Sequence, residues 1–246
     1  MIRAEAITRN YGEKRAVDSI SFEVREGEVV GFLGPNGAGK TTVLRMLSTY
    51  LPPSSGKLTV AGHDVSADPL AVRRSIGYLP EHDALFDGMR VGAFLKFCGE
   101  VHGLDAQALS TRTAQLVERC ELASVLDQRI GTCSKGYRRR ISLAAALLHD
   151  PKVLLLDEPT HGLDPLQVVA FREHISSLKE GRAILFSSHV LAEVTATCDR
   201  LLLLHHGALI LNEKTEILTE RARSEGKDLE DLILDAVRTP HGEPSA

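Results

Sequence analysis

A glycine-rich segment near the start of the chain, GPNGAGKTT at residues 34–42, carries residue types suited to binding phosphate. Glycines let backbone amides approach phosphate oxygens closely, and a following helix presents unpaired N–H groups to the same anion. Lys40 would bring positive charge to the β- and γ-phosphates of a nucleotide, and the Thr41 hydroxyl would bind Mg²⁺. The alternative is a glycine-rich turn before an ordinary helix. The pattern G-x-x-x-x-G-K-[ST] favours a nucleotide-binding loop made of Gly34, Pro35, Asn36, Gly37, Ala38, Gly39, Lys40, Thr41 and Thr42.

Two adjacent carboxylates, Asp157 and Glu158, follow the apolar run at 153–156. Side chains at the end of such a strand can face a ligand above the edge of the sheet. If the loop binds a Mg²⁺-nucleotide, Asp157 would hold the metal, and Glu158 would orient or deprotonate the attacking water. The alternative is a solvated strand end followed by a turn.

His189 also follows an apolar strand, in the sequence SSH at 187–189. An imidazole there could contact the γ-phosphate, although a helix-capping serine beside an incidental histidine would explain the pattern equally simply. Asp164, in HGLDP, is ambiguous in the same way, because it could merely cap the helix that begins at the following proline.

The elements that must position these groups alternate between strand and helix. Strands are expected at 2–6, 20–24 and 28–33, and a helix at 41–51. A helical insert is expected from about 91 to 128, followed by a strand at 153–156, a helix at 166–178 and a strand at 183–187. This alternation predicts an α/β core with a mostly parallel sheet. The charged tail from 221 to 246 predicts one helix around 228–237 and a disordered end.

Composition excludes several classes of protein. The 29 basic and 33 acidic residues give a net charge of -4, so no nucleic acid partner is expected. The cysteines are widely separated and form no C-x-x-C pair, which favours a reducing compartment over a zinc or disulfide framework. No apolar run approaches the roughly 20 residues needed to span a bilayer, so a membrane role would require a partner.

The order of these motifs over residues 2–212 resembles the nucleotide-binding subunit of ABC transporters. Tyr11 looks like the aromatic residue that stacks on adenine in that family. Glu81, in IGYLPE, stands where the family usually has glutamine. The carboxylate keeps an oxygen ligand for Mg²⁺ but adds charge and removes an amide donor.

The family's signature, commonly LSGGQ, corresponds here to residues 133–137, CSKGY, of which only Ser134 and Gly136 match. Ser134 could cap the following helix, and its hydroxyl with the Gly136 amide could meet a γ-phosphate at the positive helix end. Alone, the segment would be a serine-capped basic helix whose arginines at 138–140 form a solvated face. The resemblance instead implies that Ser134, Lys135, Gly136 and Tyr137 contact the ATP of an opposite subunit.

The resemblance implies a P-loop ABC ATPase domain at 1–220, with an N-terminal antiparallel part, a mostly parallel central sheet and a helical subdomain at about 82–150. It implies ATP and Mg²⁺ as cofactors, a homodimer or paired ATPase subunit, and docking onto an integral membrane permease from the cytoplasmic face. The implied catalytic residues are Lys40, Glu158 and His189. The implied metal ligands are Thr41, Glu81 and Asp157, and Asp164 would communicate across the dimer.

Three short segments, SKGYRRR, LPEHDALF and LLHDP, resemble those of a subgroup of ATPases that serves exporter-type ABC-2 permeases. That subgroup includes members associated with gliding motility. Two other classes of function stay open at this point. One is a soluble ABC-type ATPase that acts as a regulator or on nucleic acid or ribosomes, although such proteins usually pair two ATPase units in one chain. The other is a different phosphate-loop enzyme, such as a small-molecule kinase.

Overall fold

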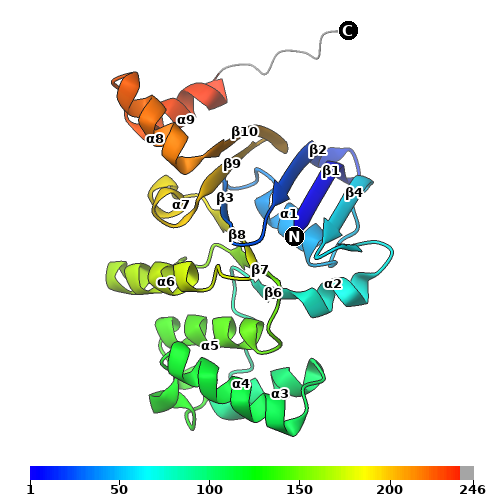
Figure 1. Ribbon diagram of the computed structural model, residues 1–246, viewed down its shortest axis with the longest axis vertical. Helices are drawn as coiled ribbons and strands as arrows, with labels where there is room; N and C mark the ends of the chain where they lie inside the picture. The colour runs from blue at the N-terminus through cyan, green and yellow to red at the C-terminus, as the bar shows by residue number, and fades with distance from the viewer. Residues whose placement is uncertain (239–246) are drawn as a thin grey trace.

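Two β-sheets organise residues 1–238, which are the residues that the computed structural model describes (Figure 1). The predicted disordered end of the tail, at 239–246, lies outside them. The larger sheet has the strand order β10-β9-β3-β8-β7-β6 and the smaller β2-β1-β4-β5. The larger is parallel from β9 to β6, with β10 antiparallel at one edge. The strands are β1 (Ile2–Tyr11), β2 (Lys14–Val24), β3 (Val29–Leu33), β4 (Ser55–Val60), β5 (His63–Asp64), β6 (Ile76–Leu79), β7 (Val153–Asp157), β8 (Ala183–Ser188), β9 (Arg200–His205) and β10 (Ala208–Lys214).

The helices surround the larger sheet and extend to one end of the molecule, where α3, α4 and α5 pack together (Figure 1). Within residues 1–238, every helix is too short or too polar to cross a bilayer. The helices are α1 (Lys40–Leu47), α2 (Pro69–Ser75), α3 (Val91–Val101), α4 (Ala106–Arg119), α5 (Lys135–Leu147), α6 (Pro165–Ser177), α7 (Leu191–Thr197), α8 (Thr215–Ser224) and α9 (Leu229–Arg238), with short 3-10 turns at Ala123–Val125 and Ile130–Thr132.

The predicted α/β class is confirmed, but several boundaries differ from the prediction. The helix expected at 41–51 ends at Leu47, because Thr49 adopts a left-handed φ of 61° that α-helix cannot continue through. The strand expected at 2–6 continues to Tyr11. The helix expected around 228–237 is α9, and α8 before it is an additional helix.

Successive side chains of the central strands fill two separate apolar clusters, because neighbours along a strand point to opposite faces of the sheet. In β7, Leu154 and Leu156 join a cluster with α3, α5 and α6. Val153 and Leu155 join a second cluster with α1 and the smaller sheet. Since both faces of β7 are covered, the strand is a continuous apolar run rather than an alternating one.

The strand order brings the predicted functional segments to one edge. β8 pairs in parallel with both β3 and β7, so the carboxyl ends of all three strands lie side by side. The glycine-rich segment follows β3, Asp157 ends β7, and His189 follows β8. The parallel pairing therefore brings the glycine-rich segment next to two segments that follow it by more than 100 residues in the sequence.

Candidate functional site

The glycine-rich loop occupies the sharp connection between β3 and α1. Gly39 has φ 109°, a value that favours glycine, and a Cβ there would lie 2.5 Å from the Ala16 carbonyl oxygen. Gly34 is equally crowded, against the Leu204 backbone. Because α1 begins at Lys40, its first N–H groups point into the loop and are free of partners within the helix. This arrangement forms a binding site for an anion such as phosphate.

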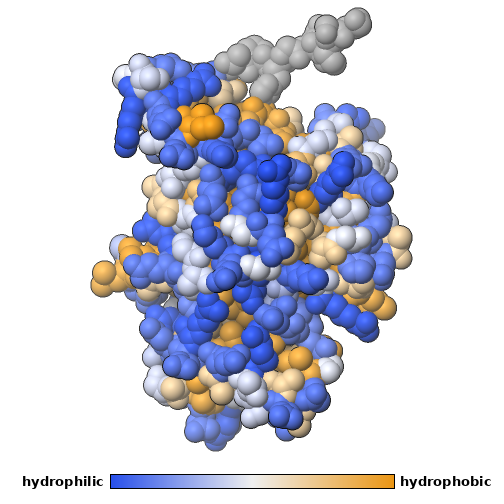
Figure 2. Space-filling model, viewed as in Figure 1, coloured by the Kyte–Doolittle hydropathy of each residue, from blue (hydrophilic) through white to orange (hydrophobic). Residues whose placement is uncertain are grey.

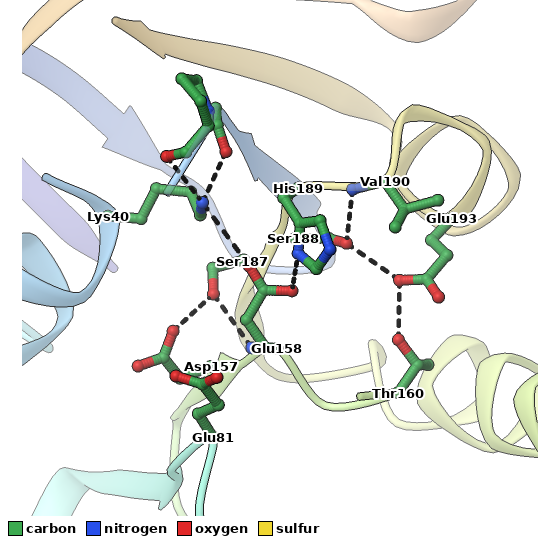
Figure 3. A network of polar contacts seen from close by, with 12 residues as sticks. Lys40, Glu81, Asp157, Glu158, Thr160, Ser187, Ser188, His189, Val190 and Glu193 are labelled. Atoms are coloured by element: carbon green, nitrogen blue, oxygen red, sulfur yellow. Dashed lines mark hydrogen bonds and ion pairs between the residues drawn. The ribbon is translucent and has the colours of Figure 1, made fainter. Parts of the chain in front are cut away.

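Lys40 is buried, and its ammonium group lies among acceptors at the mouth of the loop (Figure 3). The Nζ atom donates to the Gly34 carbonyl at 2.5 Å and to the Pro35 carbonyl at 3.3 Å. It also lies 3.5 Å from Oε1 of Glu158. The loop therefore presents a fixed positive charge beside the catalytic carboxylate that the sequence predicts.

Asp157 is almost fully buried, and its Oδ1 atom accepts hydrogen bonds from two hydroxyls. The Ser187 hydroxyl donates at 2.7 Å and the Thr41 hydroxyl at 3.5 Å. Burial raises the pKa of Asp157, the hydrogen bonds from Ser187 and Thr41 oppose that rise, and the nearby charge of Glu81 adds to it. The pair of Thr41 and Asp157 oxygens suits a hard cation such as Mg²⁺.

Glu158 is held in a left-handed backbone conformation, with φ 43°. Its N–H donates to the Ser187 carbonyl at 3.2 Å and to the Ser187 hydroxyl at 3.1 Å. Its Oε2 atom lies 2.9 Å from Nδ1 of His189, which is partly exposed (Figure 3). A non-glycine residue at positive φ is uncommon, and such strain of about 1–3 kcal/mol clusters at functional sites.

A second hydrogen-bond network lies beside Glu158 and was not predicted from the sequence. The Glu193 carboxylate accepts from the Thr160 hydroxyl at 2.7 Å and from the Ser188 hydroxyl at 2.9 Å (Figure 3). Ser188 also accepts from the Val190 N–H at 3.0 Å. Glu193, on α7, thus ties the segment after Asp157 to the segment around His189. One of its residues, Ser188, belongs to the segment SSH at 187–189, which the sequence had already indicated as a strand end.

The phosphate loop and Glu158 line a cleft of about 510 Å³. The structure brings Tyr11, Glu81 and His189 to the same cleft as the phosphate loop. Tyr11 lies at the end of β1, 42% exposed, with the Arg9 guanidinium 5.1 Å from its ring centroid. Glu81 lies beside Asp157 (Figure 3). No cluster of three or more histidine, cysteine, aspartate or glutamate side chains suited to a metal occurs in residues 1–238.

The predicted signature residues lie away from that cleft. Ser134 caps α5, with its Oγ accepting from the Tyr137 N–H at 3.4 Å, and Ser134, Gly136 and Tyr137 line a separate cavity of about 230 Å³ between α4, α5 and α6. Lys135 lies against Gly162. The structure of this single chain therefore does not bring the signature to its own phosphate loop.

Asp164 caps α6, and its Oδ1 atom accepts from the Gln167 N–H at 3.0 Å. The structure thus shows the simpler role that the sequence allowed for Asp164, which is to cap the helix that begins at Pro165. The simpler explanation for the three arginines at 138–140, a solvated helix face, holds only in part. Arg139 is 3% exposed, so these arginines do not all form a solvated face.

Known proteins resemble this chain in sequence and fold. The sequence pattern of the ABC transporter family matches residues 17–161. The ABC transporter ATP-binding protein NatA of Bacillus subtilis (strain 168) is 41% identical over 231 residues, which cover 92% of this chain and 94% of NatA. The doxorubicin resistance ATP-binding protein DrrA of Mycobacterium tuberculosis is 41% identical over 219 residues, covering 88% of this chain and 66% of DrrA. A solved ATP-binding subunit of an ABC transporter superposes with a TM-score of 0.87 at 26% identity, covering 97% of this chain and 100% of that one.

Proposed function

Because the chain belongs to the ABC transporter family as an ATP-binding and ATP-hydrolysing subunit, we propose that it powers a separate membrane permease by ATP-driven closure of a dimer. A solved bacterial ABC transporter cassette with this fold has a dimeric structure. The observation that carries the proposal is the convergence of Lys40, Glu158 and His189 at one edge of the central sheet.

Each group at this edge has a distinct proposed role. Lys40 and the N-terminus of α1 bind the β- and γ-phosphates of ATP, and Tyr11 stacks on the adenine. Glu158 orients and deprotonates the attacking water, while His189 holds the γ-phosphate and fixes the Glu158 carboxylate. Mg²⁺, when bound, would neutralise charge that develops on the phosphates, and Thr41, Asp157 and Glu81 supply the hard oxygen ligands for it.

The separate position of the signature supports a composite site. Ser134 and Gly136 lie at the N-terminus of α5, where backbone N–H groups and the helix dipole attract an anion. In the proposed dimer this end of α5 meets the γ-phosphate of the ATP bound by the opposite subunit, and Asp164 lies in the interface. Exposed apolar side chains at the start of α6, Leu166 at 83% and Val169 at 44%, agree with a covered surface there. Figure 2 shows a hydrophobic protrusion at the level of α6 in Figure 1.

A groove between the central sheet and α3 offers a site for the permease. It has a volume of about 810 Å³ and is lined mainly by apolar side chains from α3, α5 and β6. Among the described residues that line it, Arg45 and Arg73 carry charge, and His102 and His149 stack with ring centroids 3.7 Å apart. The groove therefore suits a short amphipathic cytoplasmic helix of the permease that carries carboxylates. Such docking would place this chain on the cytoplasmic face of the membrane.

The proposed direction of transport is export. Its support is the doxorubicin resistance for which DrrA is named, together with the segments SKGYRRR and LPEHDALF in this sequence. Because the chain spans 66% of the length of DrrA, activity of that whole protein is not carried over.

Replacing Glu158 with glutamine tests the proposal. Glu158→Gln keeps the shape of the side chain but removes the base, so we expect ATP hydrolysis to fall by about 10²- to 10⁴-fold while ATP binding persists. ATP with Mg²⁺ should then shift the variant to a stable dimer in size-exclusion chromatography. Glu225→Gln, on the exposed end of α8, is the matched control and should hydrolyse ATP at the parental rate. Parental hydrolysis by Glu158→Gln would exclude the role assigned to Glu158.

A further inference from the structure

Arg139 joins two loops that carry the proposed catalytic and metal-binding carboxylates. It projects from α5 and is 3% exposed. Its Nη2 atom donates to the backbone carbonyls of Asp157 and Glu158, each at 3.0 Å. Its Nε atom donates to the Pro159 carbonyl at 2.7 Å, and Nη1 donates to the Pro80 carbonyl at 2.6 Å. One guanidinium group therefore holds the segment after β7 and the segment after β6 against the same helix.

The contact with Glu158 bears directly on the strained backbone there. The Glu158 N–H is held by Ser187 of β8, and the Glu158 carbonyl is held by Arg139 of α5. A left-handed conformation at a non-glycine residue persists only where the surroundings fix it. Because the backbone angles at Glu158 set where its carboxylate points, Arg139 helps to aim the proposed base.

The charge of Arg139 is balanced locally. Its Nη1 atom lies 3.0 Å from Oδ1 of Asp83, whose side chain is 13% exposed and also accepts from the Ser142 hydroxyl at 3.0 Å. A buried guanidinium requires such a partner, since an unpaired buried charge is strongly destabilising. The planar fork supplies several donors in fixed directions, which a lysine ammonium at the end of a flexible stem does not.

The geometry points to Arg139 as a positioning residue that links the two ATP sites of the proposed dimer. The inference rests on the proposed function, in which Ser134 meets the ATP of the opposite subunit. Arg139 follows Ser134 by five residues, which is about 7.5 Å along α5 at 1.5 Å per residue. Movement of α5 when Ser134 engages the opposite ATP is thus transmitted to the carbonyls that set Glu158, Asp157 and the Glu81 loop in the same chain. Hydrolysis at each site then depends on occupancy of the other.

The test compares Arg139→Met and Arg139→Lys with Arg112→Met in the full chain. Arg112, on α4, is a matched control, because it also donates to backbone carbonyls, of Leu147 and Leu148, and pairs with Asp150. These contacts lie at the C-terminal end of α5, away from Ser134. For Arg139→Met we expect kcat to fall about tenfold or more, with the Kd for ATP unchanged within about twofold. The Mg²⁺ concentration at half-maximal rate should rise, and the dependence of rate on ATP should lose cooperativity. Arg139→Lys should recover only part of kcat, whereas Arg112→Met should keep all of these kinetic parameters even if its Tm falls.

Each outcome decides the inference. If Arg139→Met matches Arg112→Met in kcat, Mg²⁺ dependence and cooperativity, Arg139 is only structural and the inference is wrong. If Arg139→Met does not fold, Arg139→Lys decides: reduced kcat at unchanged Tm supports the inference, and parental kcat overturns it. The Glu158→Gln variant distinguishes a failure of the role assigned to Arg139 from a failure of the proposed function. An inactive Glu158→Gln with a fully active Arg139→Met overturns only the role of Arg139, whereas parental hydrolysis by Glu158→Gln overturns the proposed function itself.

Discussion

Mild acid should destabilise the folded chain through two half-buried histidines. Burial, together with the stacked ring of His102 and the charge of Arg112, lowers the pKa of His149 to about 4, and the Ile76 carbonyl and Asp150 oppose this shift. Burial, together with the charges of Arg119 and Arg140, lowers the pKa of His174 to about 4 as well, and Glu121 opposes this shift. In both cases the folded state resists protonation that the unfolded chain accepts.

The sign follows from proton counting. Between pH 6.5 and 4 the unfolded chain binds more protons than the folded chain, so the free energy of unfolding falls as pH falls. At pH 5.5, about one unit below the unfolded pKa, each histidine would cost about 1.4 kcal/mol relative to pH 7.5. Both rings keep partial solvent access, so we halve this to about 0.7 kcal/mol each and about 1.4 kcal/mol together.

The assay is urea unfolding at pH 7.5 and pH 5.5 for the parent, His149→Gln, His174→Gln and the double variant. The loss of unfolding free energy between the two pH values should be smaller in the double variant than in the parent by about 1.4 kcal/mol. His82→Gln, at a side chain that is 91% exposed, is the control and should leave the parental difference unchanged. A double variant that loses as much stability as the parent would refute the assignment.

Two further predictions concern the cleft. Ser187→Ala removes the hydroxyl that donates to buried Asp157 and accepts from the Glu158 N–H. We therefore expect the free energy of unfolding to fall by about 1–3 kcal/mol and the Mg²⁺ requirement for hydrolysis to rise. If both values stay unchanged, these hydrogen bonds do not have the role assigned to them. Gly39→Ala places a Cβ 2.5 Å from the Ala16 carbonyl at φ 109° and should abolish measurable binding of a fluorescent ATP analogue, whereas Gly88→Ala, where a Cβ meets open space, should bind normally.

The sequence predicts the parts of the site whose chemistry is local. The loop at 34–42 was predictable because the glycines, Lys40 and Thr41 follow a spacing that phosphate binding requires. The positions of Glu158 and His189 after apolar strands could also be read from the sequence, and parallel pairing brings such strand ends to one edge of a sheet. The 2.9 Å contact between their side chains is a finding of the structure, and their catalytic roles stay predictions.

The role of Arg139 could not be predicted from the sequence. Residues 138–140 are identical in type, and consecutive residues on a helix differ by about 100° in direction. Which of them faces the interior depends on how α5 packs against the segments after β6 and β7, and those contacts join residues 18 to 59 positions apart. The additional helix α8 was missed for a similar reason. Its few apolar positions, such as Leu218, acquire meaning only when they pack against β10 and α9.

The separation of the phosphate loop and the signature into two clefts of one chain has a genetic consequence. In a closed pair, each catalytic centre would take Lys40 from one copy and Ser134 from the other. Consider a cell with two alleles of the gene, one defective at Lys40 and the other at Ser134. Each allele alone would give dimers in which both centres are damaged, but a mixed dimer would combine the two lesions in one centre and leave the other intact. The hydrolysis rate of that mixed dimer would show directly how far one intact centre depends on ATP in the damaged one.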